Sequence, residues 1–432
     1  MILTLGAVSL FVRLLAYTGL VASDDLVYSY FAEQIADGTY RLVPHHFAIR
    51  YGVLLPLAAL YRLFGVHEWT TVILPLAASV LAPPLAALLA LRISGPGAAW
   101  IVGLLLACFP VEVRYASLLV PEPIMETVLL FVALLYLIAV ERRSPLLAFL
   151  AGVGFGCAYL VKETAAFVVM GFCLFAVLRK EWRVAGPLAL GAALVAAAEI
   201  GWYWSQVGDP LFRSQALEFH NRTSGAVEAN RYLSYRLWKA YPRMMLVPNL
   251  DFGLHSLVAL TLGAIAVLRD RSARVLWLSL WAALPFLFLN FGSTRISTYW
   301  VMPVSPRYIS FVYVPLFLLA GPLLSAWTKR GRWKQGLVTL LVSGTCAAGL
   351  WCGFATRNTG YHTAEVDRLR QLIAEARSSG QQLCTFRDPR PQAMAGSRWR
   401  RTVRILGPDV LGCGGDPSRV VPDSRGLPTL VL

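Results

Sequence analysis

The sequence predicts an all-α protein that crosses a membrane many times, and three observations predict it. The 432-residue chain is 57% hydrophobic and 15% charged, with a mean hydropathy of +0.59. It therefore has more apolar surface than a soluble core of this size would bury. Eleven apolar runs have about the length of a membrane helix. Clusters of basic residues fall on every second connection between these runs, as the positive-inside rule requires.

The apolar runs are the expected membrane helices. In chain order they are 1–20, 70–91, 96–111, 124–140, 145–161, 164–178, 184–204, 252–268, 275–291, 308–327 and 335–355. We expect the first run to be a retained helix and not a cleaved signal peptide, because no basic segment precedes it. Residues 40–66 are also apolar, but a twelfth crossing there would reverse the side of every later basic cluster. We expect instead a helix in the outer interface, with Arg50 and Arg62 reaching the lipid headgroups.

The basic connections set the expected orientation. They contain Arg92, Arg142, Arg143, Arg179, Lys180, Arg183, Arg269, Arg271, Arg274, Lys329, Arg330, Arg332 and Lys334. Placing them in the cytoplasm leaves residues 21–69, 205–250 and 356–432 on the outer face. The net charge of +15 then reflects loops at lipid headgroups and not nucleic-acid binding. The composition, rich in Ala, Arg, Gly and Leu, suggests a GC-rich bacterial source, and the expected location is the bacterial inner membrane.

The chain divides into a membrane domain, 1–355, and a polar tail, 356–432. In the tail, residues Ala364 to Arg377 have the apolar spacing of an amphipathic helix. Residues 382–386, 402–406 and 429–432 resemble short strands, so we expect a small α/β unit on the outer face. Cys384 and Cys413 lie there, where an oxidising compartment permits a disulfide.

Two acidic sites face the expected outer side. Asp24 and Asp25 follow the first helix directly. Two adjacent carboxylates at a membrane surface are costly to desolvate, so they need water, a cation or a function. Glu122, between Pro121 and Pro123, lies in the next outer turn; it suits the N-terminus of a helix or a shared outer cavity.

Cations are expected on the same side. Lys162 ends a glycine-rich helix, either as part of a solvated turn or as a contact for a carboxylate or phosphate. Arg231 lies in a loop rich in cations and aromatic residues, Arg295 precedes the tenth helix, and Arg307 begins it. Arg307 either reaches out to water or binds a phosphate.

Together these motifs resemble the protein O-mannosyltransferase and aminoarabinose-lipid A transferase group (glycosyltransferase family 39), membrane enzymes of the type C fold. The resemblance rests on Asp24-Asp25 with Tyr28 and Ala32, the Pro121-Glu122 turn, Lys162, and Arg307-Tyr308 followed by Pro315. Asp25 stands where the family usually has Glu. The resemblance covers residues 1–330 in order.

The resemblance implies inverting transfer of a sugar from a polyprenyl-phosphate donor to a hydroxyl of a lipid, glycan or protein. Asp24 is the expected base, although Asp25 stays an alternative, and Asp25 and Glu122 would orient the acceptor or tune the base. The residues expected at the substrate are Tyr28, Arg50, Lys162, Arg231, Arg295, Arg307 and Tyr308. No cofactor is expected, and a divalent cation held by the acids stays an alternative. A transporter or flippase, or a glycan polymerase or ligase, are the competing functions.

Overall fold

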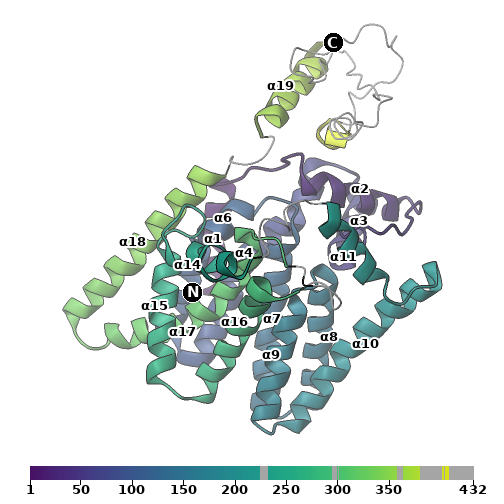
Figure 1. Ribbon diagram of the computed structural model, residues 1–432. Coiled ribbons are helices and arrows are strands. Elements are labelled where there is room, and N and C mark those ends of the chain that lie inside the picture. The colour runs from purple at the N-terminus through teal and green to yellow at the C-terminus, as the bar shows by residue number, and fades with distance from the viewer. Residues whose placement is uncertain are drawn as a thin grey trace.

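The computed structural model describes residues 1–223, 232–293, 299, 301–357, 363–379, 401–402 and 404–407. These residues form helices and no strand; their one β-bridge joins Ser293 to Val301. The helices pack side by side into a bundle whose long members run between two ends (Figure 1). The all-α class expected from the sequence is confirmed for this part of the chain.

Six helices of the described part are long and apolar enough to span a membrane. They are α4 (Glu68–Ser94), α7 (Pro121–Arg142), α10 (Trp182–Val207), α16 (Ala273–Phe291), α17 (Ser310–Thr328) with the 3-10 turn η1 (Pro306–Ile309), and α18 (Arg332–Thr356). The shorter apolar helices are α1 (Ile2–Leu15), α3 (Tyr51–Phe64), α5 (Pro96–Ala107), α8 (Pro145–Val161), α9 (Ala165–Leu178) and α15 (His255–Arg269). Each of the eleven expected runs forms a helix, while eleven crossings stay a prediction.

Local sequence explains where several helices begin and end. Pro96, Pro121 and Pro145 occupy the first helical position of α5, α7 and α8, where a missing N–H costs nothing. The Ser144 hydroxyl accepts a hydrogen bond from the Leu147 amide at 3.3 Å and so caps α8. These signals set the turns that carry the polar residues described below.

The remaining helices lie mostly at one end of the bundle, which we call the outer end. They are α2 (Asp24–Ala36), α6 (Pro110–Tyr115), α11 (Phe212–Thr223), α13 (Leu233–Trp238), α14 (Tyr241–Leu246) and α19 (Thr363–Ser379). Figure 1 shows α2, α3 and α19 at the top, with the α9–α10 and α15–α16 turns at the bottom. The short α3 lies beside α2 at this end, and its position in the outer interface of a membrane stays a prediction.

The basic turns gather at the opposite end. Arg92, after α4, pairs with Glu141 at the end of α7 at 2.6 Å. Arg274, at the start of α16, donates a hydrogen bond to the Ser94 hydroxyl at 3.2 Å. Basic turns that are distant in sequence thus share one end, as the alternation of charges predicted; that this end faces the cytoplasm stays a prediction.

Glycines of α8 allow the close helix packing that the sequence suggested. A Cβ on Gly152 would lie 2.1 Å from the carbonyl oxygen of Leu188 in α10, and one on Gly191 would lie 2.3 Å from that of Phe149. Only glycine permits such an approach of two backbones. This contact sets the position of the α8 C-terminus, which carries Lys162.

The tail differs from the expected α/β unit. The predicted amphipathic helix is confirmed as α19. The strand expected at 402–406 is wrong for its described part, because 402 and 404–406 are helical. The alternation of polar and apolar residues suggested a strand. Ile405 is instead buried against residues of α19 and against Leu20, Ala22 and Leu26. The strands at 382–386 and 429–432 and the Cys384–Cys413 disulfide lie outside the described residues.

Candidate active site

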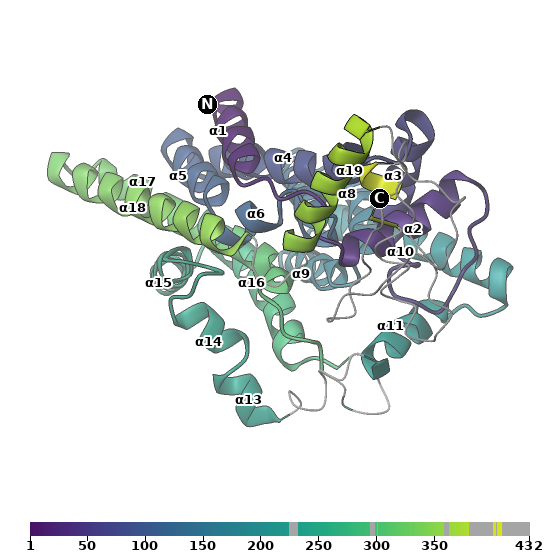
Figure 2. The same ribbon diagram turned by 90° about the horizontal axis from the view of Figure 1, so that it is seen from above.

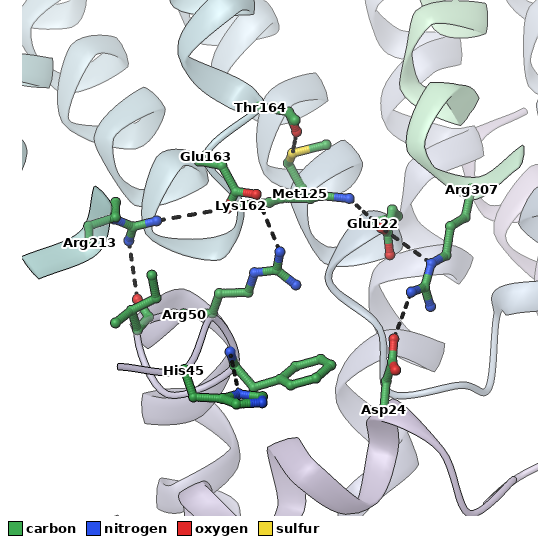
Figure 3. A network of polar contacts seen from close by, with 12 residues as sticks. Asp24, His45, Arg50, Glu122, Met125, Lys162, Glu163, Thr164, Arg213 and Arg307 are labelled. Atoms are coloured by element: carbon green, nitrogen blue, oxygen red, sulfur yellow. Dashed lines mark hydrogen bonds and ion pairs between the residues drawn. The ribbon is translucent and has the colours of Figure 1, made fainter. Parts of the chain in front are cut away.

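Asp24 and Asp25 begin α2 and have different surroundings. The Asp25 carboxylate accepts hydrogen bonds from the backbone amides of Val21 at 2.7 Å, Ser23 at 2.5 Å and Leu26 at 3.0 Å. Burial raises the pKa of Asp25 above its ordinary value, and these three amides oppose the rise. The Asp24 side chain is 26% exposed and turns toward Arg307 (Figure 3).

Arg307 connects the two acidic sites that the sequence singled out. It lies in η1, at the start of the tenth expected helix, and donates a hydrogen bond to Asp24 Oδ2 at 2.7 Å. Its Nε lies 3.7 Å from Glu122 Oε1. One guanidinium therefore joins α2 to the first turn of α7, which are 98 residues apart in sequence when counted from Asp24 to Glu122.

Glu122 and Lys162 form a buried ion pair. Their Oε1 and Nζ atoms are 2.5 Å apart, and each side chain is only 2% exposed. The Lys162 ammonium also lies 3.7 Å from the centre of the Tyr308 ring, a cation–π contact. The solvated-turn alternative for Lys162 is therefore wrong, because the end of α8 points its lysine into the bundle.

Glu163, the residue after Lys162, forms a second cluster with two arginines. Its carboxylate lies 3.3 Å from Arg50 and 3.9 Å from Arg213. Burial would raise the pKa of Glu163, but the charges of Arg50, Lys162 and Arg213 outweigh it and hold that pKa below its ordinary value. Arg213 also pairs with Glu199 of α10 at 2.5 Å. Two adjacent residues of one turn thus connect two buried charge clusters (Figure 3).

Arg50 belongs to this second cluster and does not reach the lipid headgroups. It is only 7% exposed, and it donates a hydrogen bond to the Tyr28 hydroxyl at 2.5 Å. The expectation of a headgroup contact is wrong because α3 approaches the end of α8 closely. A Cβ on Gly52 would lie 2.6 Å from the backbone nitrogen of Val161, so glycine brings Arg50 within reach of Glu163.

The predicted site residues fall into three groups. Asp24, Glu122, Lys162, Arg307 and Tyr308 meet in one cluster, which we call the acidic-basic cluster. Arg50 contacts the Tyr28 hydroxyl and the carboxylate of Glu163, the residue next to Lys162. Asp25 accepts hydrogen bonds from backbone amides of the preceding loop. Arg231 and Arg295 lie outside the described residues.

Sequence reasoning did not assign a role to Glu163 or to Glu199. Glu199 is the acid of α10, within an otherwise apolar run, and an ionisable residue in a membrane helix is itself a signal of function. Its partner Arg213 lies in the basic segment 205–250, among several other cations. Their pairing depends on α11 folding back against α10, which no local pattern predicts.

The acidic-basic cluster offers the elements of a group transfer. The partly exposed carboxylate of Asp24 can accept a proton, and the two fixed cations Lys162 and Arg307 can neutralise a phosphate. Across the described ranges, no group of three or more His, Cys, Asp or Glu side chains is arranged to hold a metal ion.

Comparison with known proteins shows the fold. The dolichyl-phosphate-mannose-protein mannosyltransferase family matches residues 53–204. No curated protein sequence matches the chain. The structure is similar to apo ArnT from Cupriavidus metallidurans, with 17% identity, a TM-score of 0.61 and coverage of 96% of this chain and 86% of ArnT. For ArnT bound to undecaprenyl phosphate, the identity is 16%, the TM-score 0.63 and the coverage again 96% and 86%.

An oligosaccharyltransferase from Archaeoglobus fulgidus, in a complex with zinc and sulfate, is also similar. The identity is 15% and the TM-score 0.56, over 86% of this chain and 55% of the archaeal protein. The expected resemblance to membrane glycosyltransferases of the type C fold is thereby confirmed.

Proposed function

We propose that this protein is a membrane glycosyltransferase that moves a sugar from a polyprenyl-phosphate donor to an acceptor hydroxyl, with inversion. The observation that carries the proposal is the acidic-basic cluster, in which Asp24, Glu122, Lys162 and Arg307 meet at the outer end of the bundle. The similar fold of ArnT, one structure of which binds undecaprenyl phosphate, supports a lipid-phosphate donor. The outer face of a bacterial inner membrane is the proposed location.

The reaction needs a base at the acceptor hydroxyl. The hydroxyl oxygen attacks the anomeric carbon from the face opposite the phosphate, and its proton passes to a carboxylate. We assign this role to Asp24, whose side chain is partly exposed, and not to Asp25, whose oxygens are taken by backbone amides. Asp25 acts as a positioning residue, because its three hydrogen bonds hold the loop from which Asp24 extends.

The leaving group needs positive charge. As the bond between the anomeric carbon and the phosphate oxygen breaks, the lipid phosphate leaves with the electron pair. Lys162 and Arg307 are the proposed phosphate contacts, because fixed cations stabilise developing charge without reorganisation. Glu122 lies 2.5 Å from Lys162 and 3.7 Å from Arg307, and it holds both cations in place. Tyr308 lies under Lys162, and Tyr28, Arg50, Arg231 and Arg295 are proposed as further substrate contacts.

The test is transfer of radiolabelled sugar from polyprenyl-phosphate donors to acceptors in membranes that contain each variant. Asp24→Asn is expected to slow transfer by about 10²- to 10⁴-fold, the usual contribution of a general base, with donor binding retained. Asp37→Asn, which changes an exposed acid at the end of the same helix, is the matched control and should transfer at the parental rate. A parental rate in Asp24→Asn, or no turnover with any donor, would overturn the proposal and favour a transporter.

A further inference from the structure

The segment that joins α1 to α2, residues 17–23, has an unfavourable backbone conformation. Ala22 has φ +57°, in the left-handed region, which costs a residue with a side chain about 1–2 kcal/mol. Such a conformation persists only where the surroundings enforce it. Leu20, Ala22 and Leu26 are buried, at 1%, 0% and 6% exposure, although they lie beyond the end of the long helices.

The apolar surroundings of this segment come from the far end of the chain. Leu20, Ala22 and Leu26 form one buried cluster with Val366, Leu369 and Ile373 of α19 and with Ile405. Seen from above, α19 lies across the region between α1 and α2 (Figure 2). The helix therefore covers the segment from which Asp24 extends.

Polar contacts join the same partners. Arg370 of α19 forms an ion pair with Glu68, and it donates a hydrogen bond to the Thr18 carbonyl at 3.5 Å. The Glu68 carboxylate also accepts the Leu20 amide at 3.1 Å. Gly19 lies between these groups with φ +71°, and a Cβ there would lie 2.3 Å from a Glu68 oxygen, so the contact needs glycine.

A second arginine of the tail holds α2 itself. Arg401 forms an ion pair with Glu33, and it donates hydrogen bonds to the Ser29 carbonyl at 2.6 Å and the Ser29 hydroxyl at 2.8 Å. Arg404 adds a 2.5 Å contact with Glu33. The Arg401 and Glu33 side chains are only 11% and 8% exposed, so this pair is largely shielded from water, whereas Arg404 is 54% exposed.

We infer that the C-terminal clamp, defined as α19 with residues 401, 402 and 404–407, is a positioning element for the reaction. It holds residues 17–23 and the start of α2 so that Asp24 meets Arg307. The inference rests on the proposed function, in which Asp24 is the base. Arg401 and Arg370 are its main positioning residues, since each joins the clamp to this region by more than one polar contact.

The test combines two measurements on the full-length protein. Amide hydrogen exchange, followed by mass spectrometry without substrate, reports the order of residues 17–26. Radiolabelled transfer gives kcat and KM for the polyprenyl-phosphate donor. The variants are Arg401→Ala, Glu33→Gln and Arg370→Ala, with Arg368→Ala, an exposed arginine of α19, as the matched control.

In Arg401→Ala we expect exchange in 17–26 to become about tenfold faster, since a charged hydrogen bond is lost from a locally folded unit. The kcat should fall while KM for the donor stays near the parental value, because Lys162 is not held by the clamp. Arg401→Lys should recover part of the kcat. Glu33→Gln should match Arg401→Ala, and Arg368→Ala should match the parent in both measurements.

Parental exchange in 17–26 in Arg401→Ala, Glu33→Gln and Arg370→Ala would overturn the inference. Faster exchange with a parental kcat would overturn it too, because the clamp would then be structural only. Failure of the proposed function is recognised separately: Asp24→Asn would keep the parental kcat, whereas the exchange measurement involves no substrate and would still report the clamp.

Discussion

Removing the Glu122 carboxylate is expected to destabilise the protein because it leaves the Lys162 ammonium buried without its partner. Both side chains are 2% exposed and their charged atoms are 2.5 Å apart. Breaking a buried ion pair from one side costs about 3–5 kcal/mol. Glutamine keeps the shape and one acceptor oxygen, so we expect Glu122→Gln to lie near 3 kcal/mol, at the lower end of this range.

The chain contains a matched control on the same helix. Glu141, at the other end of α7, pairs with Arg92 at 2.6 Å, but its side chain is 43% exposed. Because water already solvates this pair, Glu141→Gln is expected to cost about 0–1 kcal/mol. The two pairs have nearly the same length, so the difference between the variants measures the effect of burial.

The assay is equilibrium unfolding in mixed detergent micelles, with the free energy of unfolding compared among parent, single variants and the double variant Glu122→Gln/Lys162→Met. Removing both charges should cost less than the sum of the single changes by about 2–3 kcal/mol. Arg307 retains Asp24 as a partner in every variant, so it does not obscure the coupling. A cost below about 1 kcal/mol for Glu122→Gln, or additive single effects, would refute the assignment of a buried pair.

Three further predictions follow from single positions. Gly52→Ala should destabilise the protein by about 1–3 kcal/mol, because the added methyl group would overpack against Val161. Gly186→Ala, whose methyl group would enter open space, should not destabilise it. A comparison of the melting temperatures of the two variants tests this. Folding lowers the pKa of Glu163, so its ionised carboxylate stabilises the protein above the unfolded pKa of about 4.3. This stabilisation is lost as the pH falls through the folded pKa. Between pH 6 and pH 3 the melting temperature of Glu163→Gln should therefore fall less than that of the parent. Arg307→Lys keeps the positive charge but loses the planar guanidinium that contacts both Asp24 and Glu122. The initial rate of sugar transfer should therefore fall more than tenfold. A parental rate would contradict the bridging role of Arg307.

The helices could be predicted from the sequence for a physical reason. A backbone in lipid must satisfy its hydrogen bonds within each segment, so a long apolar run has almost no alternative to a helix. The turns were also readable, because Pro121 and Pro145 mark helix starts locally. The tail offered no such constraint, since short polar segments in water can adopt several conformations. Of the strand expected at 402–406, the described residues 402 and 404–406 are helical.

The candidate site was only partly readable. Asp24, Glu122, Lys162 and Arg307 could be placed on one side by counting crossings, and the structure brings them together. The burial of Arg50 could not be predicted, because it depends on the approach of α3 to α8 at one glycine. A cation near a membrane surface otherwise reaches water.

By itself, the sequence determined that this protein is helical and membrane-embedded, and it placed Asp24, Glu122, Lys162 and Arg307 at one end. Only the tertiary structure decided their partners. Asp24 and Asp25 are neighbours, yet successive helical residues point about 100° apart, so one meets Arg307 and the other the amides of its own loop. Periodicity and charge act along the chain and are visible in it. Which side chains become partners depends on how helices distant in sequence pack, and on the water that this packing excludes.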